Sequence, residues 1–423
     1  MWVQYCLLRQ KCCDGNIDTV PLVSNRKYLS VRNRRFIKKF YPYCFISLFA
    51  VFHTILFTDI ARAERTFIHP GATNTLENLS FVKEKITSGE QPWTNEYHRI
   101  KHSKYTTRTA HALTTVNSKN NEAFQSRDDA LAAYTQALLW HLSGEINYAD
   151  SSISILNSWS GLRGFSSGTG QDKLQAAWLG AIFACAAELM RDYPGWKKDD
   201  IEKLQAMFKH TFYPQLNHMS HWNGNVDLTQ IEAILAIAVF NDDEQELQLG
   251  LKRFEQRIPA YFYLTSDGPL PIAINNDERN IKVFWSTPTQ WIDGLSQESC
   301  RDNGHHSQFA LGSAIHAAEI AWNQGIDIYT KHQTRLVMAM ELLAQQLLNN
   351  NFSSCQNTTA TKNRFNTWEM GFNHFAHRKG LKLPFTAKLI HKQIRPSSTR
   401  AAWNLAYETL THADIDKPAL SQQ

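Results

Sequence analysis

The segment from Trp291 to His306 concentrates side chains that can do acid–base chemistry. Glu298, Arg301 and His305 are spaced three and four residues apart, and on a continuous helix that spacing places them on one face. A glutamate, an arginine and a histidine that face the same way suit a substrate that carries a carboxylate and must lose a proton. The alternative is structural, because Glu-x-x-Arg is also common as a surface ion pair and a single histidine is usually a satisfied polar side chain. The adjacent His306 and the flanking glycines favour the chemical interpretation.

A second polar cluster runs from His218 to Asn225 and leads into a predicted helix from Asp227. Its asparagines, Asn223 and Asn225, are either caps of that helix or ligands of a sugar, whose hydroxyl or carboxylate oxygens accept hydrogen bonds from side-chain amides. Trp222, just before them, offers a ring that can stack on a pyranose face. The cluster therefore predicts carbohydrate binding, with capping as the alternative.

Two further groups of residues are candidates for the site. Trp368, Glu369 and His374 lie close together in the sequence, and a helix would gather them on one side, as expected for the wall of a groove. Tyr261 and Tyr263 follow a predicted helix, where tyrosines are more often buried packing than catalysts.

Motifs for other chemistries are absent from the sequence. It contains no Gly-rich phosphate loop, no serine nucleophile elbow and no His-Glu-x-x-His zinc motif. It also lacks paired cysteines at zinc-ligand spacing, and His305-His306 is not a metal-ligand spacing on a helix. We therefore expect no metal and no cofactor.

The charge distribution identifies a leader. Residues 1–63 contain ten Lys/Arg and three Asp/Glu, so the net charge of +5 conceals a net charge of −2 for residues 64–423. A nucleic-acid-binding protein would keep its positive charge in the folded part, which excludes that class of partner. Basic residues from Arg34 to Lys39, an apolar run from Tyr43 to Thr58 and Ala61-Arg62-Ala63 predict a secretory signal cleaved after Ala63, although an N-terminal membrane anchor is the alternative.

The predicted signal locates the mature protein in the periplasm or outside the cell, with no stable membrane partner after cleavage. Residues 1–30 precede the basic region and indicate a start codon assigned too early. Cleavage would leave Cys185, Cys300 and Cys355 in an oxidising compartment. Cys185 lies in the apolar stripe of a predicted helix and is expected to be a buried thiol. The other two lie near polar loops and are predicted to form a disulfide.

Helical periodicity dominates the chain from Asp128 onward. Predicted helices about 12–20 residues long with short connections should form antiparallel pairs. The sequence shows no strict short repeat, which favours an α/α toroid (an incomplete α/α barrel) over a solenoid, with one domain spanning residues 64–423. The polar stretches would be loops around a central groove; they are residues 161–170, 218–225, 267–279, 294–304 and 349–366.

These motifs together resemble the alginate lyase superfamily of secreted bacterial polysaccharide lyases, in particular its branch acting on alginate or glucuronan. The resemblance covers nearly all of the chain after Ala63, and its most specific part is Glu298-x-Cys-Arg-Asp-x-x-His305. One departure is Val226, where related chains have a tryptophan; it removes one stacking surface and bears on substrate preference. The other matching segments are His69-Pro70-Gly71, Pro92-Trp93, Trp140 with Gly144, Asn223-Gly224-Asn225, Asp267-Gly268, Gln324-Gly325-x-Asp327-x-Tyr329 and Thr367-Trp368-Glu369 with His374.

The resemblance implies an α/α toroid that cleaves a 1,4-linked uronic acid polymer by β-elimination, leaving a 4,5-unsaturated uronic end. Arg301, Asn223 and Asn225 would hold the substrate carboxylate, and Glu298 would orient the arginine.

The general base would be His305, with His306 as the alternative, and the acid would be Tyr263, with Tyr261 or Tyr329 as alternatives. Trp222, Trp368, Glu369 and His374 would line the subsites. The partner would be an acidic polysaccharide.

Two other classes of function fit some of the same residues. A carbohydrate-binding protein without catalysis would keep the tryptophans but would not need His305. A glycoside hydrolase on the same toroid would need two carboxylic acids across a cleft, for which Glu298, Asp302 and Glu369 are candidates. Neither the uronic acid nor endo versus exo cleavage follows from the sequence.

Overall fold

The computed structural model describes residues 65–221, 223–274, 280–396, 401, 403–404 and 406–415. Ala63–Gln423 form one compact unit. The predicted leader, the membrane-anchor alternative and Trp222 lie outside the described residues.

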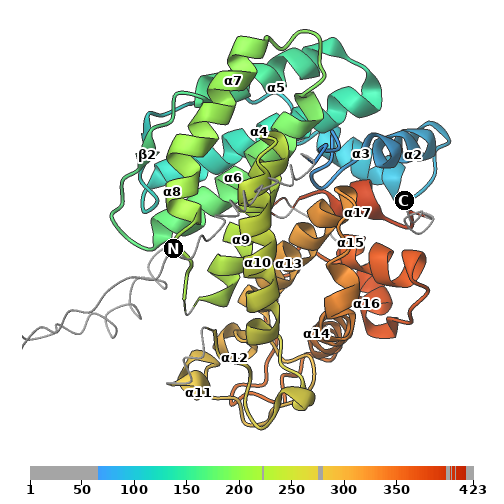
Figure 1. Ribbon diagram of the computed structural model, residues 1–423. Helices are drawn as coiled ribbons and strands as arrows, with labels where there is room; N and C mark the ends of the chain where they lie inside the picture. Colours follow the sequence, from blue (N-terminus) through green and yellow to red (C-terminus); the bar gives the residue numbers. More distant parts are fainter. Residues whose placement is uncertain are drawn as a thin grey trace, which may run out of the picture. The chain divides into compact units, whose positions relative to one another are not determined.

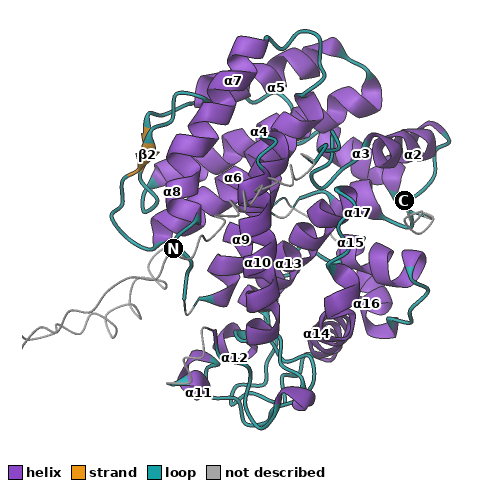
Figure 2. Ribbon diagram, viewed as in Figure 1, coloured by secondary structure: helices purple, strands orange, loops and turns teal. Residues whose placement is uncertain are grey.

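The described part of the chain is almost entirely helical (Figure 2). Its strands are β1 (Thr115–Val116) and β2 (Gly164–Phe165), which pair in parallel. The helices are α2 (Leu76–Thr87), α3 (Trp93–Lys101), α4 (Asn121–Ser143), α5 (Ile146–Trp159), α6 (Gln171–Met190), α7 (Lys198–Met207), α8 (Tyr213–Leu216), α9 (Gly224–Phe240), α10 (Glu244–Tyr261), α11 (Ile281–Phe284), α12 (Ser299–Asp302), α13 (His305–Asn323), α14 (Tyr329–Asn349), α15 (Glu369–Phe372), α16 (Pro384–Leu389) and α17 (Glu408–His412). Single π-helical turns follow α7, α15 and α16.

Four helices, α4, α6, α9 and α13, pack side by side as an inner layer (Figure 1). Every residue of α9 is buried. A helix that is apolar on all sides must be covered on all sides, and neighbours from both layers cover this one. The inner layer therefore forms the core of the domain.

The outer helices are amphipathic partners of the inner ones. In α5 the buried residues, among them Ala149, Ser152, Ile155 and Trp159, recur every three or four positions and form one stripe. A two-residue connection joins α4 to α5, and three residues join α9 to α10. Connections this short make each inner–outer pair antiparallel.

The inner layer closes into a ring through the two ends of the domain. α15 packs on α13, α17 on α15, α2 on α17, and α2 returns to α4. Gln324, just after α13, reinforces the closure, because its side-chain amide donates to the carbonyls of Ile68 and Gly71 at 2.9 Å. The result is an α/α toroid, which confirms the predicted fold class.

The apolar helix α6 is long enough to cross a bilayer, but 78% of its apolar window is buried inside the protein. Burial of this extent is typical of the core helix of a globular domain, and the packing of α6 between α4 and α9 accounts for it.

Candidate active site

Glu298 is the centre of a hydrogen-bonded cluster at the start of α12. Its carboxylate is buried and accepts hydrogen bonds from the Arg301 guanidinium at 2.6 Å and the Tyr261 hydroxyl at 2.7 Å. It also accepts from the backbone N–H of Asn225 at 3.2 Å and from the side-chain amide of the same residue. Four donors satisfy the carboxylate, which therefore holds three elements together. The predicted orienting role of Glu298 fits this geometry.

The prediction of one helical face from Glu298 to His305 is wrong. α12 ends at Asp302, Asn303 and Gly304 both adopt left-handed backbone conformations, and α13 begins at His305. Gly304 has φ +95°, and a Cβ there would lie 2.7 Å from Phe352, so no larger residue fits. The break takes His305 and His306 out of the helical register of Arg301. His305 still lies close enough to Arg301 for the charge of the guanidinium to act on it.

Arg301 presents an exposed cation next to its buried partner. Its side chain is 45% exposed, whereas that of Glu298 is 4% exposed. Burial of part of the guanidinium opposes its charge, but the carboxylates of Glu298 and Asp302 outweigh this and raise the pKa of Arg301. One end of the guanidinium is thus fixed by Glu298, and the remaining N–H groups can bind an incoming carboxylate.

His306 is held in a defined orientation by Asp302. Its Nδ1 is hydrogen bonded to the Asp302 carboxylate, and its backbone N–H donates to the same group at 3.0 Å. Burial alone would raise the pKa of Asp302, but the hydrogen bonds and charge of His306 lower it. Because Nδ1 carries the proton that is donated to Asp302, the neutral ring exposes a lone pair at Nε2. That is the tautomer of a general base.

His305 has the opposite tautomer. The side-chain amide of Asn363 donates to its Nδ1 at 2.9 Å, so the neutral ring carries its proton on Nε2. Burial and then the charge of His306 lower the pKa of His305, and they outweigh Asp302. A neutral imidazole with Nε2–H can donate a hydrogen bond. The geometry therefore favours His305 as a hydrogen-bond donor to the substrate and His306 as the group that accepts a proton.

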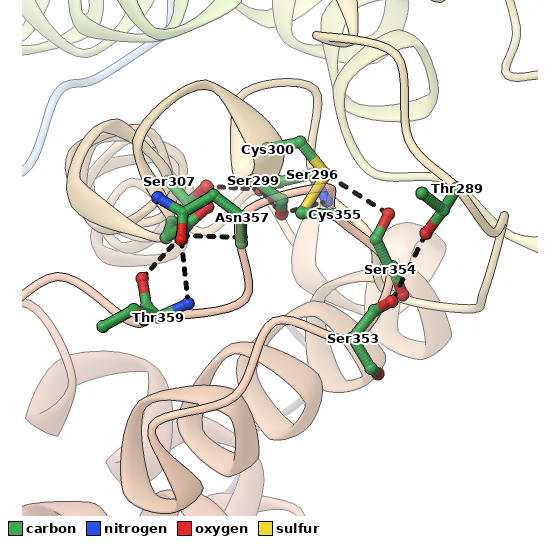
Figure 3. Close-up of a disulfide and its surroundings, with 11 residues drawn as sticks. Thr289, Ser296, Ser299, Cys300, Ser307, Ser353, Ser354, Cys355, Asn357 and Thr359 are labelled. Carbon is green, nitrogen blue, oxygen red and sulfur yellow. Dashed lines mark hydrogen bonds between the residues drawn. A yellow bond between two sulfur atoms is a disulfide. The ribbon is translucent and has the colours of Figure 1, made fainter.

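A disulfide fastens the loop that carries Asn363 to the site. Cys300 and Cys355 are bonded, as predicted (Figure 3), and Cys185 is a buried free thiol, also as predicted. The side chain of Asn303 donates to the carbonyls of Asn357 and Thr359 on the same loop. The disulfide and these hydrogen bonds therefore brace the Glu298–Arg301 segment, and they also position Asn363.

The loop before α9 packs closely against the cluster. A Cβ on Gly224 would lie 2.1 Å from the ring of Tyr261, so only glycine allows this approach. Asn223 precedes α9 and is exposed, and its side chain makes no capping hydrogen bond. Asn225 is buried against Glu298. The two asparagines are therefore not equivalent, since Asn223 is accessible to a ligand and Asn225 supports Glu298.

The structure does not bring Tyr263 into the cluster. Its hydroxyl donates to the Gly268 carbonyl at 2.6 Å, and its ring packs with Trp285 and Trp291 in a separate apolar cluster. Tyr261, two residues earlier, contacts Glu298 instead. Tyr329 is fully buried and donates to the Ile315 carbonyl, so it cannot reach a substrate either. Tyr261 is the last residue of α10, whereas Tyr263 follows the extended Phe262, so their side chains leave the backbone in different directions.

The predicted groove wall formed by Trp368, Glu369 and His374 is also wrong. Trp368 and His374 are 0% exposed and Glu369 is 1% exposed. Glu369 is bonded to Arg395, and His374 stacks on Tyr329 with 3.7 Å between ring centroids. Burial lowers the pKa of His374 to about 3. These residues close the toroid rather than contact a ligand.

An aromatic group beside His305 was missed from the sequence. The rings of Phe309, Phe365 and Trp403 lie 5.1, 5.1 and 6.3 Å from that of His305. Phe309 lies four residues along α13 from His305, but Phe365 and Trp403 come from distant segments that local spacing does not reveal. Among the described residues, no group of three or more His, Cys, Asp or Glu is arranged to hold a metal ion.

Comparison with known proteins places the chain among carbohydrate-cleaving enzymes. The profile of the family described as alginate lyase matches residues 72–352. No curated protein sequence matches significantly.

Several solved structures share the fold. A histidine-to-alanine variant of alginate lyase A1-III, complexed with a tetrasaccharide, aligns with a TM-score of 0.55 and 16% identity over 74% of this chain and 88% of that one. Alginate lyase A1-III from Sphingomonas species A1 gives 0.53 and 15% over 75% and 94%. An alginate lyase from Bacteroides ovatus gives 0.52 and 13% over 81% and 99%. At these identities the likeness concerns the fold.

Proposed function

The chain belongs to the alginate lyase family and is a polysaccharide lyase, and from this premise we propose that it cleaves alginate by β-elimination at the cluster around Glu298. The observation that carries the proposal is that a fixed, exposed guanidinium, Arg301, and an oriented imidazole, His306, both interact with Asp302. The predicted alternative substrate, glucuronan, has the same 1,4-linked uronate chemistry and is an outcome of the test below.

The reaction makes three demands on the protein. The C5 proton is weakly acidic, and its removal builds negative charge on the adjacent carboxylate, which must be neutralised in place. A base must take the proton, and an acid must protonate O4 as the C4–O4 bond breaks. The electrons of the C5–H bond form the C4–C5 double bond of the new end.

Arg301 meets the first demand. Glu298 fixes its guanidinium, so little reorganisation is needed when charge develops on the substrate. A planar guanidinium can bind a carboxylate through two parallel hydrogen bonds. The exposed Asn223 amide is a second candidate donor, and Asn225 and Tyr261 act through Glu298 as positioning residues.

The two histidines meet the other demands. In our proposal His306 takes the C5 proton at Nε2, because Asp302 holds its other nitrogen protonated. The imidazolium so formed then gives this proton to O4 as the C4–O4 bond breaks. His305 donates a hydrogen bond to O4 from Nε2–H, because Asn363 donates to its other nitrogen. Their ring centroids are 5.2 Å apart, so both can reach one sugar linkage. This assignment reverses the base preference drawn from the sequence and replaces Tyr263 as the acid.

The geometry disfavours a glycoside hydrolase. That reaction needs one protonated and one ionised carboxyl group facing each other across the substrate. Glu298 is buried under four donors, and Glu369 is buried against Arg395 and Thr409. Asp302 is engaged by His306. No two of these three carboxyl groups can therefore face each other across a substrate.

We propose that the protein acts in the periplasm or outside the cell. The disulfide between Cys300 and Cys355 supports this, because such bonds persist in oxidising compartments.

The experiment is to incubate the purified protein with polymannuronate, polyguluronate and glucuronan, and to follow ultraviolet absorbance and new reducing ends together. We expect both to rise in parallel with at least one alginate block, because each cleavage makes one double bond. Reducing ends without absorbance would identify a hydrolase, and a response to glucuronan alone would replace alginate as the substrate.

A further inference from the structure

A row of aromatic and cationic contacts leads away from the candidate active site. It starts at His305 and passes to Trp403 with 6.3 Å between ring centroids, and from Trp403 to Trp178 with 5.9 Å. The guanidinium of Arg127 then lies 4.9 Å from the Trp178 ring and 4.7 Å from the ring of Phe124. We call these four residues beyond His305 the aromatic row. It joins α4, α6 and the C-terminal segment to the N-terminus of α13.

Arg127 is the unusual member of this row. It is half-buried between two rings, its Nε donates to the Ala123 carbonyl at 2.9 Å, and no carboxylate of the described residues is paired with it. Its neighbour Asp128 is instead bonded to Lys104. Burial lowers the pKa of Arg127 to about 10, although the charge of Asp128 opposes this, so the group remains charged at neutral pH without forming an ion pair.

Other arginines in the domain behave differently. Arg257 is paired with Asp227 at 2.7 Å, and Arg378 is paired with Glu319 at 2.7 Å. Cations withdrawn from water are normally paired in this way, because an unpaired charge is costly. Cation–π contacts offset part of that cost at Arg127. Its terminal N–H groups have no partner among the described residues and are available to an external anion.

The rings of the row suit a sugar chain. Phe124 is 56% exposed, while Trp178 and Trp403 are partly exposed. Phe309 and Phe365 support Trp403 from behind, at 4.5 and 5.8 Å between ring centroids. Supported, partly exposed aromatic faces can stack on the apolar faces of pyranose rings. Successive contacts of this size extend beyond one sugar ring.

We propose that the aromatic row is a distal subsite for the same acidic polysaccharide, in which Arg127 binds the carboxylate of a uronate residue remote from the cleaved bond. The proposal rests on the function proposed above and adds a specificity determinant to it. Each uronate of the polymer carries one carboxylate, so a second fixed guanidinium beyond Arg301 selects chains long enough to reach both. The enzyme therefore favours polymers and long oligomers over short ones.

The test measures binding and cleavage separately with the full chain. Binding of alginate di- and hexasaccharides is followed by calorimetry in a His306→Gln background, with and without Arg127→Gln. Cleavage of the same oligomers is followed in proteins that keep His306. Arg127→Lys keeps the charge but loses the planar fork, and Lys198→Gln removes one exposed charge from α7 as the matched control. Thermal unfolding confirms that each variant is folded.

We expect Arg127→Gln to weaken hexasaccharide binding and kcat/KM by about 10- to 100-fold, because a charge-assisted hydrogen bond is lost. Disaccharide binding should stay unchanged, Arg127→Lys should be intermediate, and Lys198→Gln should match the parent. Equal effects on both oligomers, or none, would overturn the subsite.

The two proposals can fail separately. Arg127-dependent hexasaccharide binding without any cleavage would retain the subsite and reject the function. Cleavage that does not depend on Arg127 would retain the proposed function and reject the subsite.

Discussion

Two acid–histidine clusters lie on the same helix, α13, and differ in almost every physical respect. His306, in the first turn, is paired with one carboxylate, Asp302, and both side chains are partly exposed. His316, ten residues later, lies between Glu232 at 2.9 Å and Glu408 at 2.8 Å, and all three side chains are buried. Asn404 donates to Glu232 in the same cluster.

The comparison shows that the surroundings of a histidine decide whether it has a structural or a catalytic role. Both nitrogens of His316 are engaged, and although burial opposes its charge, the two glutamates raise its pKa to about 10. It is therefore a cation at neutral pH and links α9, α13 and α17. His306 has one nitrogen engaged and the other available. A histidine with a free nitrogen near solvent can exchange protons, whereas one enclosed by two carboxylates can only hold the fold.

The first way to sharpen the comparison is to remove the exposed cation beside His306. Arg301→Met should lower kcat by about 100- to 1,000-fold, the usual cost of losing one stabilising group for a developing anion. The domain should lose about 1–3 kcal/mol of stability, because the buried Glu298 carboxylate loses one donor but keeps the three from Asn225 and Tyr261. Lyase rates and chemical unfolding measure the two effects. An unchanged kcat would contradict the assignment of Arg301.

The second change is made at the buried cluster. His316→Ala should destabilise the domain by about 3–5 kcal/mol, because it leaves two buried carboxylates without a cation. Denaturant unfolding measures this. The double variant Glu232→Gln/His316→Ala should recover part of the loss, since one of the uncompensated charges is removed. A single-variant cost below about 1 kcal/mol would break the contrast between the two clusters.

The third change tests the brace at the exposed end. Replacing Cys300 and Cys355 together by serine should cost about 2–4 kcal/mol, because the bond closes a long loop with a sequence separation of 55 residues. Activity should fall below wild type even where the protein is folded, because Asn363 loses its fixed position beside His305. Full activity of the folded double variant would show that the brace does not position the site.

The buried cluster also predicts a pH dependence of stability. The folded pKa of His316, about 10, lies above its unfolded value near 6.5, so its contribution is complete below pH 6.5 and is lost as pH rises through 10. The gap in unfolding free energy between wild type and His316→Gln, on the order of a few kcal/mol, should therefore shrink between these limits. A gap that is constant from pH 6.5 to 10 would indicate a neutral His316.

The smallest effect is expected outside both clusters. Tyr263→Phe removes one hydrogen bond, to Gly268, and should cost about 0.5–1.5 kcal/mol of stability with no change in rate. Tyr261→Phe should lower the rate, because Glu298 loses a donor. A large loss of activity in Tyr263→Phe alone would restore it as the acid.

The helices, the disulfide and the Glu298–Arg301 pair were predictable because each depends on short-range spacing or on cysteine number. Two features of the site could not be predicted from local sequence spacing. A continuous helix was assumed between Arg301 and His305, but Asn303 and Gly304 adopt left-handed conformations that spacing does not reveal. His374 and Trp368 are residue types that are common in sugar-binding grooves, and the sequence predicts them in a groove wall. Closure of the ring buries them instead. Their burial depends on segments tens of residues away, such as Trp322 and Tyr329 against His374, which local spacing does not reveal.

The most direct test of the account is the initial rate of ultraviolet absorbance for His306→Gln, on the polyuronate that the wild type cleaves, at a temperature where both are folded. The account predicts a loss of about 100- to 10,000-fold, the usual contribution of a general base, with unfolding unchanged. His305→Gln should lose less, because it removes a hydrogen-bond donor to O4 but leaves His306, which transfers the proton. Activity of His306→Gln near that of the wild type would contradict the assignment of the exposed pair as the catalytic one.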